Sequence, residues 1–428
     1  MSTLRLSPYE TAKFVSAHAS DVEIKEENVE KLSELFEVMK HIITHLEGYA
    51  LTCIENSILS DGAMPMVEKM ERFIQLLKGY LFWEEDSSVI GPGTCPSRKF
   101  KALKIYSRNC DAILEASPNV LLYSLLTYKM NTSIKSWKQH PAHPKKMDST
   151  AIDWIFFVDT LNFSFWSENQ SDKFTVTWNG TQYTGYFSLC AAVNKAIDSG
   201  IPITDPKYFK NITLDKFTEH LQSDDGSSMP LMDERLRAIH EAGCVLLDKF
   251  DGSFVSCIKQ SNKSALRLLN IIVENFSSYK DEADYMGKKV SLYKRAQILI
   301  ADIWACFEGQ GLGEFYDIEA ITMFADYRIP QVLAYFGALK YSESLEQLLK
   351  KDHLFENGDK LEVELRASSI WCVEMIKEAI RRKCRETSEK PSIPINSILI
   401  DNFLWDYRRA HDQDVKAIPF HKIRCIYY

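Results

Sequence analysis

The sequence lacks the features that mark secreted and membrane proteins. Its first residues carry no apolar stretch like that of a signal peptide, and no run of about 18 apolar residues suggests a membrane span. Its 10 cysteines are scattered, without C-x-x-C spacing or a short, dense disulfide framework. Free thiols persist in reducing compartments. We therefore expect a cytoplasmic protein that does not associate with a membrane.

Several motifs of catalysis and cofactor binding are also missing. The chain has no G-x-x-x-x-G-K-[ST] phosphate loop and no G-x-S-x-G nucleophile motif. The glycines within 309–313 follow no predicted strand, so they predict a loop that ends a helix. His140 and His143 are three residues apart, but no Cys pair or second His pair offers matching ligands nearby. We interpret these histidines as part of a solvated loop and expect no metal.

Basic residues are in the minority. The chain has 51 Lys+Arg against 59 Asp+Glu, a net charge of −8. This sign repels phosphate backbones and argues against stable nucleic-acid binding, whereas a small anionic ligand needs only a few basic groups. Hydrophobic residues make up 45% of the chain and aromatic residues 12%, which excludes a disordered protein and allows a large core.

The residue patterns predict a mainly helical fold with a small antiparallel β-hairpin. Apolar and polar residues alternate from Phe174 to Trp178, and Asn179-Gly180 follows. That dipeptide tolerates the positive φ angles of a tight turn, so we predict a hairpin there and few other strands. We predict helices at 27–45, 65–80, 117–130, 186–198, 231–249, 263–275, 291–307, 330–338, 343–350, 361–383 and 395–410.

Two charged residues stand in strongly apolar surroundings. Lys294 begins a helix that is apolar on nearly all sides. It either extends its ammonium to solvent from the helix end or lies buried beside a partner, because burial disfavours the charged form. Asp326 lies in an apolar and aromatic run just before a helix. It either stabilises the start of that helix or acts as a carboxylate in a dry aromatic pocket.

A second acidic pair lies near the end of the chain. Asp401 and Asp406 are separated by about 140° around a predicted helix, so they do not stack, although both could line one wide cavity beside Trp405. The alternative is that both are simply solvated. The aromatic tail at 420–428 differs from the polar, frayed end of most chains, and we expect it to be docked on the protein.

Taken together, these segments resemble the queuosine salvage protein family. The matching strings are those at 157–166, 185–194, 293–297, 321–331, 404–407 and 424–428. The resemblance covers essentially all of 150–428 and returns at 6–8 and 13–15. The first third departs from the family pattern, since Trp137-Lys138-Gln139-His140 arrives late in the chain. We therefore divide the chain into an N-terminal helical part of the catalytic unit (1–45), a helical insertion (46–133) and a glycosidase core (134–428).

This resemblance implies a fold similar to helix-hairpin-helix DNA glycosylases. It also implies hydrolysis of queuosine 5′-phosphate to queuine and ribose 5-phosphate, which supplies queuine for tRNA modification, with no metal or organic cofactor. Carried over onto matching positions, Asp326 is the catalytic carboxylate and Lys294 the basic group of the same motif pair. The resemblance places Phe324, Asp401 and Asp406 against the base, with His140 as a further candidate whose loop differs in length from the family pattern.

The implied chemistry suits a carboxylate. Breaking a C1′–N bond builds positive charge on the ribose, which an ionised carboxylate stabilises. Two rival functions are a DNA glycosylase, which needs a basic face and a wedge for base flipping, and a non-catalytic helical protein that binds nucleotides or partners.

Overall fold

The computed structural model describes residues 5–33, 136–167, 173–386 and 395–428. The chain divides into two compact units, one formed by residues 1–29 and 131–428 and the other by residues 30–130. The helices predicted at 65–80 and 117–130 and the insertion predicted at 46–133 lie outside the described residues. The helix predicted at 27–45 is described only up to residue 33, and that part is helical.

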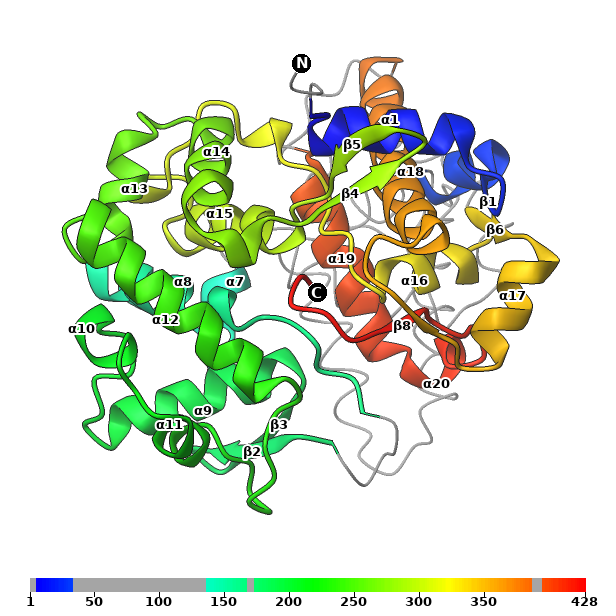
Figure 1. Ribbon diagram of the computed structural model, residues 1–428. Helices are drawn as coiled ribbons and strands as arrows, with labels where there is room; N and C mark the ends of the chain where they lie inside the picture. Colours follow the sequence, from blue (N-terminus) through cyan, green and yellow to red (C-terminus); the bar gives the residue numbers. More distant parts are fainter. Residues whose placement is uncertain (1–4, 34–135, 168–172, 387–394) are drawn as a thin grey trace, which may run out of the picture. The chain divides into compact units, whose positions relative to one another are not determined.

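The described part of the first unit is built mainly from α-helices (Figure 1). The helices are α1 (Pro8–His18), α7 (Ser136–Gln139), α8 (Ser149–Thr160), α9 (Tyr186–Asp198), α10 (Pro206–Phe209), α11 (Leu214–His220), α12 (Met232–Lys249), α13 (Phe254–Gln260), α14 (Ala265–Asn275), α15 (Lys294–Cys306), α16 (Ile329–Tyr335), α17 (Glu343–Lys350), α18 (Lys360–Glu386), α19 (Ser397–Ala410) and α20 (Asp412–Val415). Short 3₁₀ helices are η2 (Ser277–Tyr279), η3 (Gly311–Gly313) and η4 (Ile318–Ala320). The helices predicted from 186 to 410 are confirmed, with ends that differ by a few residues. The helices that were not predicted are α1, α7, α8, α10, α11, α13 and α20.

The strands form two-stranded pairs. The predicted hairpin is confirmed: β2 (Thr175–Trp178) pairs antiparallel with β3 (Thr181–Thr184), and Asn179 and Gly180 have φ of 49° and 75°. The expectation of few other strands is wrong. Antiparallel pairs also join β4 (Glu282–Tyr285) to β5 (Lys288–Ser291) and β1 (Val22–Ile24) to β6 (Leu339–Tyr341), and a parallel pair joins β7 (Leu354–Phe355) to β8 (Lys422–Ile423).

The large core surrounds α8 and α15, which pack against each other. The aromatic run of α8 is responsible, since Trp154, Phe156 and Phe157 are all buried. Asp148 caps this helix by accepting hydrogen bonds from the backbone N–H groups of residues 150 and 151. Burial of such large apolar side chains is the main stabilising contribution to the fold.

A second group of helices surrounds α18. This helix packs against α1 and α19, and α19 also packs against α16 (Figure 1). The tail joins the same region: β8 pairs with β7, Trp166 donates a hydrogen bond of 2.7 Å to the carbonyl of Ile423, and Tyr428 is buried. The prediction of a docked tail is confirmed.

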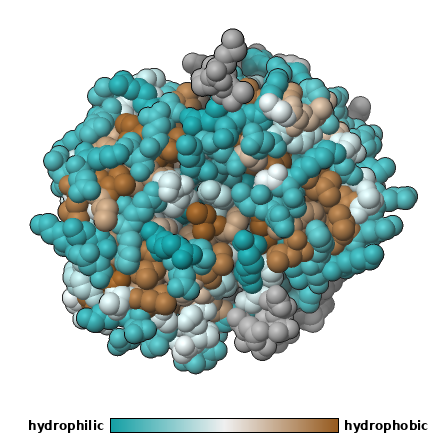
Figure 2. All heavy atoms as spheres, in the orientation of Figure 1, coloured by the Kyte–Doolittle hydropathy of each residue, from teal (hydrophilic) through white to brown (hydrophobic). Residues whose placement is uncertain are grey.

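The described residues include no helix that could span a membrane. None of the helices with described bounds combines the length and the apolar character that a crossing requires. On the face drawn in Figure 2, the described apolar atoms lie in separate patches among hydrophilic ones.

Candidate active site

Lys294 is held at the first position of α15. Its backbone N–H donates to Asp281 Oδ2 (3.1 Å), while Tyr293 before it takes a left-handed conformation with φ of 50°. The side chain is 7% exposed, so the ammonium does not extend into solvent as the first interpretation predicted. It forms no hydrogen bond or ion pair with any described residue. Burial lowers the pKa of this lysine, and the charge of Asp326 acts in the opposite direction.

The two carboxylate oxygens of Asp326 differ in their hydrogen bonding. Oδ1 accepts hydrogen bonds from the backbone N–H groups of Arg328 (2.7 Å) and Ile329 (2.9 Å) at the start of α16. Oδ2 forms no hydrogen bond within the described chain, and the residue is half-buried. Asp326 therefore stabilises the start of a helix and still presents an oxygen with an open hydrogen-bonding position.

Asp401 joins these two residues from α19. It is buried, and its Oδ2 accepts a hydrogen bond from the backbone N–H of Phe324 (3.3 Å). Burial raises the pKa of Asp401 well above its usual range, the charge of Asp326 adds to this, and the charge of Lys294 opposes it. The structure thus brings Lys294, Phe324, Asp326 and Asp401 together, and the interpretation of Asp401 as a solvated surface residue is wrong.

A second set of aromatic and charged side chains contains His140 and Asp406. The ring of His140 stacks on Phe187 at 3.6 Å, and the guanidinium of Arg409 lies over both Phe187 and Trp405. Burial lowers the pKa of His140 to about 4, so the ring is neutral at neutral pH. Burial raises the pKa of Asp406 to about 7, while Arg409 opposes the rise. Flat rings beside a carboxyl group suit a planar heterocycle with polar edges.

The histidine loop does not form a metal site in the described residues. His143 Nδ1 lies 2.9 Å from the carbonyl of Trp137, and its ring stacks on Trp137 at 4.0 Å. Its other ring nitrogen faces the hydroxyl of Tyr186 at 3.2 Å. No group of three potential metal-binding side chains occurs among the residues described. The interpretation as a solvated loop is wrong for His143, which is buried.

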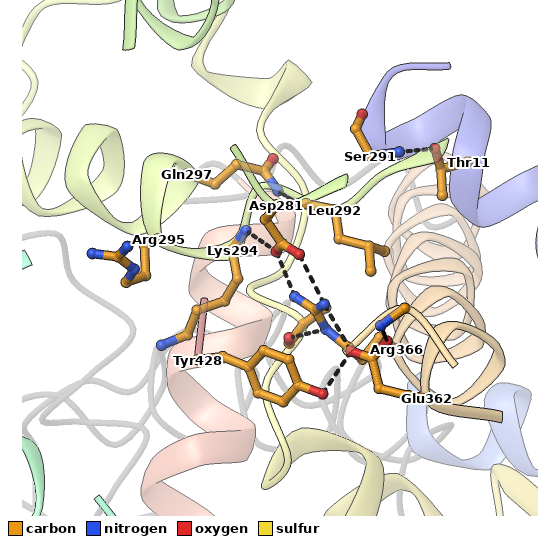
Figure 3. A network of polar contacts seen from close by, with 12 residues as sticks. Thr11, Asp281, Ser291, Leu292, Lys294, Arg295, Gln297, Glu362, Arg366 and Tyr428 are labelled. Atoms are coloured by element: carbon orange, nitrogen blue, oxygen red, sulfur yellow. Dashed lines mark hydrogen bonds and ion pairs between the residues drawn. The ribbon is translucent and has the colours of Figure 1, made fainter. Parts of the chain in front are cut away.

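A closed network of buried charges connects Asp281, Glu362, Arg366 and Tyr428 and reaches the backbone of Lys294 (Figure 3). Arg366 on α18 donates to both carboxylate oxygens of Asp281 (3.0 and 2.5 Å), to Glu362 (2.9 Å) and to the carbonyl of Ala325 (2.8 Å). Asp281 in turn accepts from the backbone N–H of Lys294. One guanidinium is therefore connected to the residue before Asp326 and, through one carboxylate, to the backbone of Lys294.

Sequence reasoning assigned no role to a further pair of acids. Asp159 ends α8 and is 1% exposed, and Asp302 lies two turns after Lys294 on α15. Burial raises the pKa of Asp159 to about 7, and burial followed by the charge of Asp159 raises that of Asp302 well above its usual range. The positive charge of Lys294 opposes the rise in the pKa of both carboxyl groups. Although Asp159 lies within one of the matching strings, nothing local in the sequence indicates that its carboxyl group is buried.

Three of these side chains combine partial exposure with strongly shifted pKa values. Asp302, Asp406 and His140 keep partial exposure, yet burial is the largest cause of the shift in each pKa. Charged groups at such positions, with perturbed pKa values, are characteristic of sites where a protein binds or transforms a small molecule.

These features make up a candidate small-molecule site with several acidic side chains on a helical scaffold. Sequence comparison assigns the chain to a family. The chain belongs to the queuosine salvage protein family, whose profile matches residues 142–428. The resemblance identified from the residue strings is thereby confirmed.

Curated relatives come from distant organisms and carry the same name, queuosine 5′-phosphate N-glycosylase/hydrolase. The mouse protein is 51% identical over 296 residues, which cover 69% of this chain and 87% of the mouse protein. The protein of Bos taurus is 53% identical over 297 residues, with the same coverage. That of Sphaerobacter thermophilus is 34% identical over 276 residues, which cover 64% of this chain and 81% of the bacterial protein.

Proposed function

We propose that this chain hydrolyses the N-glycosidic bond of queuosine 5′-phosphate and releases queuine and ribose 5-phosphate. Family membership and the name shared by relatives as distant as mouse and a bacterium support this activity. The observation that carries the proposal is the situation of Asp326. One of its oxygens is fixed by two backbone N–H groups, and the other forms no hydrogen bond within the described structure.

The reaction follows from the charge of this carboxylate. As the C1′–N bond breaks, its electron pair moves to the base nitrogen and positive charge builds on the ribose. Oδ2 of Asp326 stabilises that charge and orients the water whose oxygen bonds to C1′. The proton lost by the water replaces the sugar on the base nitrogen. Queuine is a 7-deazaguanine and has no N7 to protonate, so stabilisation at the sugar and hydrogen bonding at the base edge carry more of the catalysis.

The remaining predicted residues fit the recognition of the base. A raised pKa favours the protonated form of Asp401, which can then donate a hydrogen bond to an acceptor on the base edge. The ring of His140 stacks on Phe187, where a planar base could also stack, and Asp406 interacts electrostatically with Arg409, whose guanidinium lies over Phe187. Phe324 contributes an apolar surface and its backbone N–H fixes Asp401. Lys294 supplies a positive charge beside Asp326. Side chains and water are sufficient for this reaction, without a metal or organic cofactor.

Three finer expectations belong to the same proposal. We expect the fold to resemble helix-hairpin-helix DNA glycosylases, the protein to act in the cytoplasm, and nucleic acids not to bind stably. The net charge of −8 supports the last of these. A duplex-binding assay at low and high salt tests it, and tight, salt-sensitive binding would favour the DNA-glycosylase alternative instead.

The direct test is to incubate the protein with queuosine 5′-phosphate and measure free queuine by mass spectrometry. We expect release by the wild type and a loss of about 100-fold or more in kcat for Asp326→Asn, with the affinity for the substrate retained. Near-wild-type turnover of this variant would remove Asp326 from the mechanism.

A matched control separates catalysis from helix capping. Asp148 accepts hydrogen bonds from the backbone N–H groups two and three residues after it, in the same pattern as Asp326. Asp148→Asn should therefore perturb a helix start to a similar extent and leave kcat unchanged.

A further inference from the structure

Asp159 is a buried carboxylate with a hydrogen-bond partner at only one of its two oxygens. It lies at the end of α8 and is 1% exposed. One oxygen accepts a hydrogen bond from the side chain of Asn162 (3.2 Å), and Oδ2 has no hydrogen-bond partner in the described structure. An unsatisfied buried carboxylate oxygen is costly, so its retention points to an interaction that matters for function.

The neighbouring Arg295 does not supply that interaction through its side-chain nitrogens. Its Nη1 donates to the carbonyls of Asp159 (3.2 Å) and Thr160 (2.6 Å), and its Nη2 donates to the carbonyl of Ser278. The guanidinium therefore fixes the backbone at the end of α8 rather than pairing with the carboxylate. This arrangement leaves Asp159 Oδ2 available to a second cation.

Lys294 is a buried cation that lacks a partner among the described residues. Its ammonium is buried without an ion pair to any described residue, and α15, which begins with it, packs against α8. In Figure 3 the side chain of Lys294 points away from Asp281, although its backbone N–H bonds to that residue. The titratable groups that interact electrostatically with it are Asp326 from the segment before α16, Asp401 from α19, Asp159 from α8, and Arg295 and Asp302 from α15 itself.

We propose that Asp159 is a positioning residue whose free carboxylate oxygen attracts the Lys294 ammonium through its negative charge, without a direct ion pair, in the site beside Asp326. This inference rests on the proposed N-glycosidase function. A second buried carboxylate keeps the lysine from forming a closed ion pair with Asp326, which would neutralise the charge that the ribose needs. It also stabilises the charged form of an ammonium that burial disfavours.

The test is the kinetics of Asp159→Asn, an isosteric change that removes one negative charge. We expect kcat to fall about 10-fold with KM within about twofold of wild type. Because Asp159 favours the charged form of Lys294, its loss lowers the pKa of the lysine. In a plot of kcat against pH, the fall at high pH (the alkaline limb) should therefore move to lower pH by about one unit.

Two further variants show whether the effect belongs to the carboxylate. Asp153→Asn changes an aspartate of the same helix whose pKa burial also raises, to about 6, but whose side chain accepts from Ser253 instead. It should leave both kcat and the alkaline limb unchanged. Asp159→Glu should recover part of the lost rate and return the alkaline limb toward wild type.

A second approach applies if Asp159→Asn does not fold. Asn162→Ala removes the hydrogen bond that orients the carboxylate and favours its charged form. We expect the alkaline limb to move in the same direction by a smaller amount. An unchanged limb in whichever variant folds, or an increase in KM alone, would overturn the proposal, because an increase in KM alone means that Asp159 contacts the substrate.

Failure of the proposed function is distinguishable from failure of this inference. A wild-type protein that releases no queuine rejects the function, whereas an active wild type with an unaltered Asp159→Asn profile rejects only the positioning role. Acylation of Lys294 by acetic anhydride, followed against pH by mass spectrometry, reports the pKa of the lysine without substrate. A lower midpoint in Asp159→Asn supports the proposal, and an identical midpoint contradicts it.

Discussion

Two groups of buried charges meet at the start of α15, and they differ in how completely they are paired. In the closed network, Arg366 bonds to Asp281, Glu362 and the carbonyl of Ala325, and Tyr428 donates to Glu362. In the open cluster, defined by Lys294, Asp159 Oδ2 and Asp326 Oδ2, the polar groups form no hydrogen bond with described residues. Asp159 and Lys294 are buried, as are the members of the closed network, yet only the closed network has its hydrogen bonds satisfied by the protein itself.

This difference in pairing indicates that the closed network is part of the scaffold and that the open cluster is part of the site. A buried charge network whose members all have partners fixes one arrangement of the chain, and breaking it is costly. Buried polar groups without partners are tolerated where a ligand completes them. The two groups also touch, because Asp281 accepts the Lys294 backbone N–H and Arg366 holds the residue before Asp326. The closed network thus keeps the open one in position.

The largest expected effect is the loss of Arg366. Arg366→Met leaves two buried carboxylates without their cation, and we expect the free energy of unfolding to fall by about 3–5 kcal/mol. Denaturant unfolding followed by circular dichroism measures it. The control is Arg381→Met on the same helix, which breaks more exposed ion pairs with Glu319 and Glu378 and should cost no more than about 1 kcal/mol. Equal losses in the two variants would mean that the closed network contributes no special stability.

The next effect should appear in activity rather than in stability. Lys294→Met removes a buried ammonium that no described residue pairs, so we expect the free energy of unfolding to stay within about 1 kcal/mol of wild type or to increase. Release of queuine should nevertheless fall by about 100-fold. Turnover and denaturant unfolding are measured on the same preparation.

A paired lysine provides the comparison. Lys377 is also buried, but it donates to Glu374 one turn before it on α18. Lys377→Met should destabilise the protein more than Lys294→Met does. If the two variants lose similar stability, the distinction between paired and unpaired charges fails.

The sequence predicted the local features of this arrangement well. The apolar residues on nearly all sides of α15 indicated burial of this helix, although they left open whether Lys294 extends to solvent, and Asn179-Gly180 located one hairpin. Asp326 was interpreted both as a helix-start residue and as a site carboxylate, and the structure supports the first interpretation while leaving an oxygen for the second. Each of these inferences needs only neighbouring residues.

Long-range pairings account for what the sequence did not predict. Asp281 and Arg366 are 85 residues apart, and no periodic pattern connects them. The hairpin of β4 and β5 was missed because its exposed positions carry charges without clear apolar alternation, and β7 and β8 pair over only two residues. The burial of Asp159 depends on the packing of α8 against α15, which emerges only when the chain has folded.

The smallest expected effect is a dependence of stability on pH that belongs to the closed network. His421 is buried, and its Nε2 lies 3.2 Å from the hydroxyl of Tyr428. Burial, and then the charge of Arg366, lowers its pKa from 6.5 to about 3. In the unfolded chain the imidazole takes up a proton below pH 6.5, whereas in the folded chain it stays neutral until about pH 3. The neutral, buried imidazole therefore contributes fully to stability above pH 6.5. This contribution is lost as the pH falls toward 3, because the unfolded chain takes up the proton first.

At pH 5 this linkage should cost the wild type about 2 kcal/mol of unfolding free energy relative to pH 8. His421→Gln keeps a neutral polar group and cannot titrate. The change in its unfolding free energy between pH 8 and pH 5 should therefore be smaller than that of the wild type by about 2 kcal/mol. Denaturant unfolding of both proteins at pH 5 and pH 8 gives the difference. If the two proteins respond identically, His421 takes up a proton as readily in the folded chain as in the unfolded one, and the network around Arg366 is open to water rather than closed.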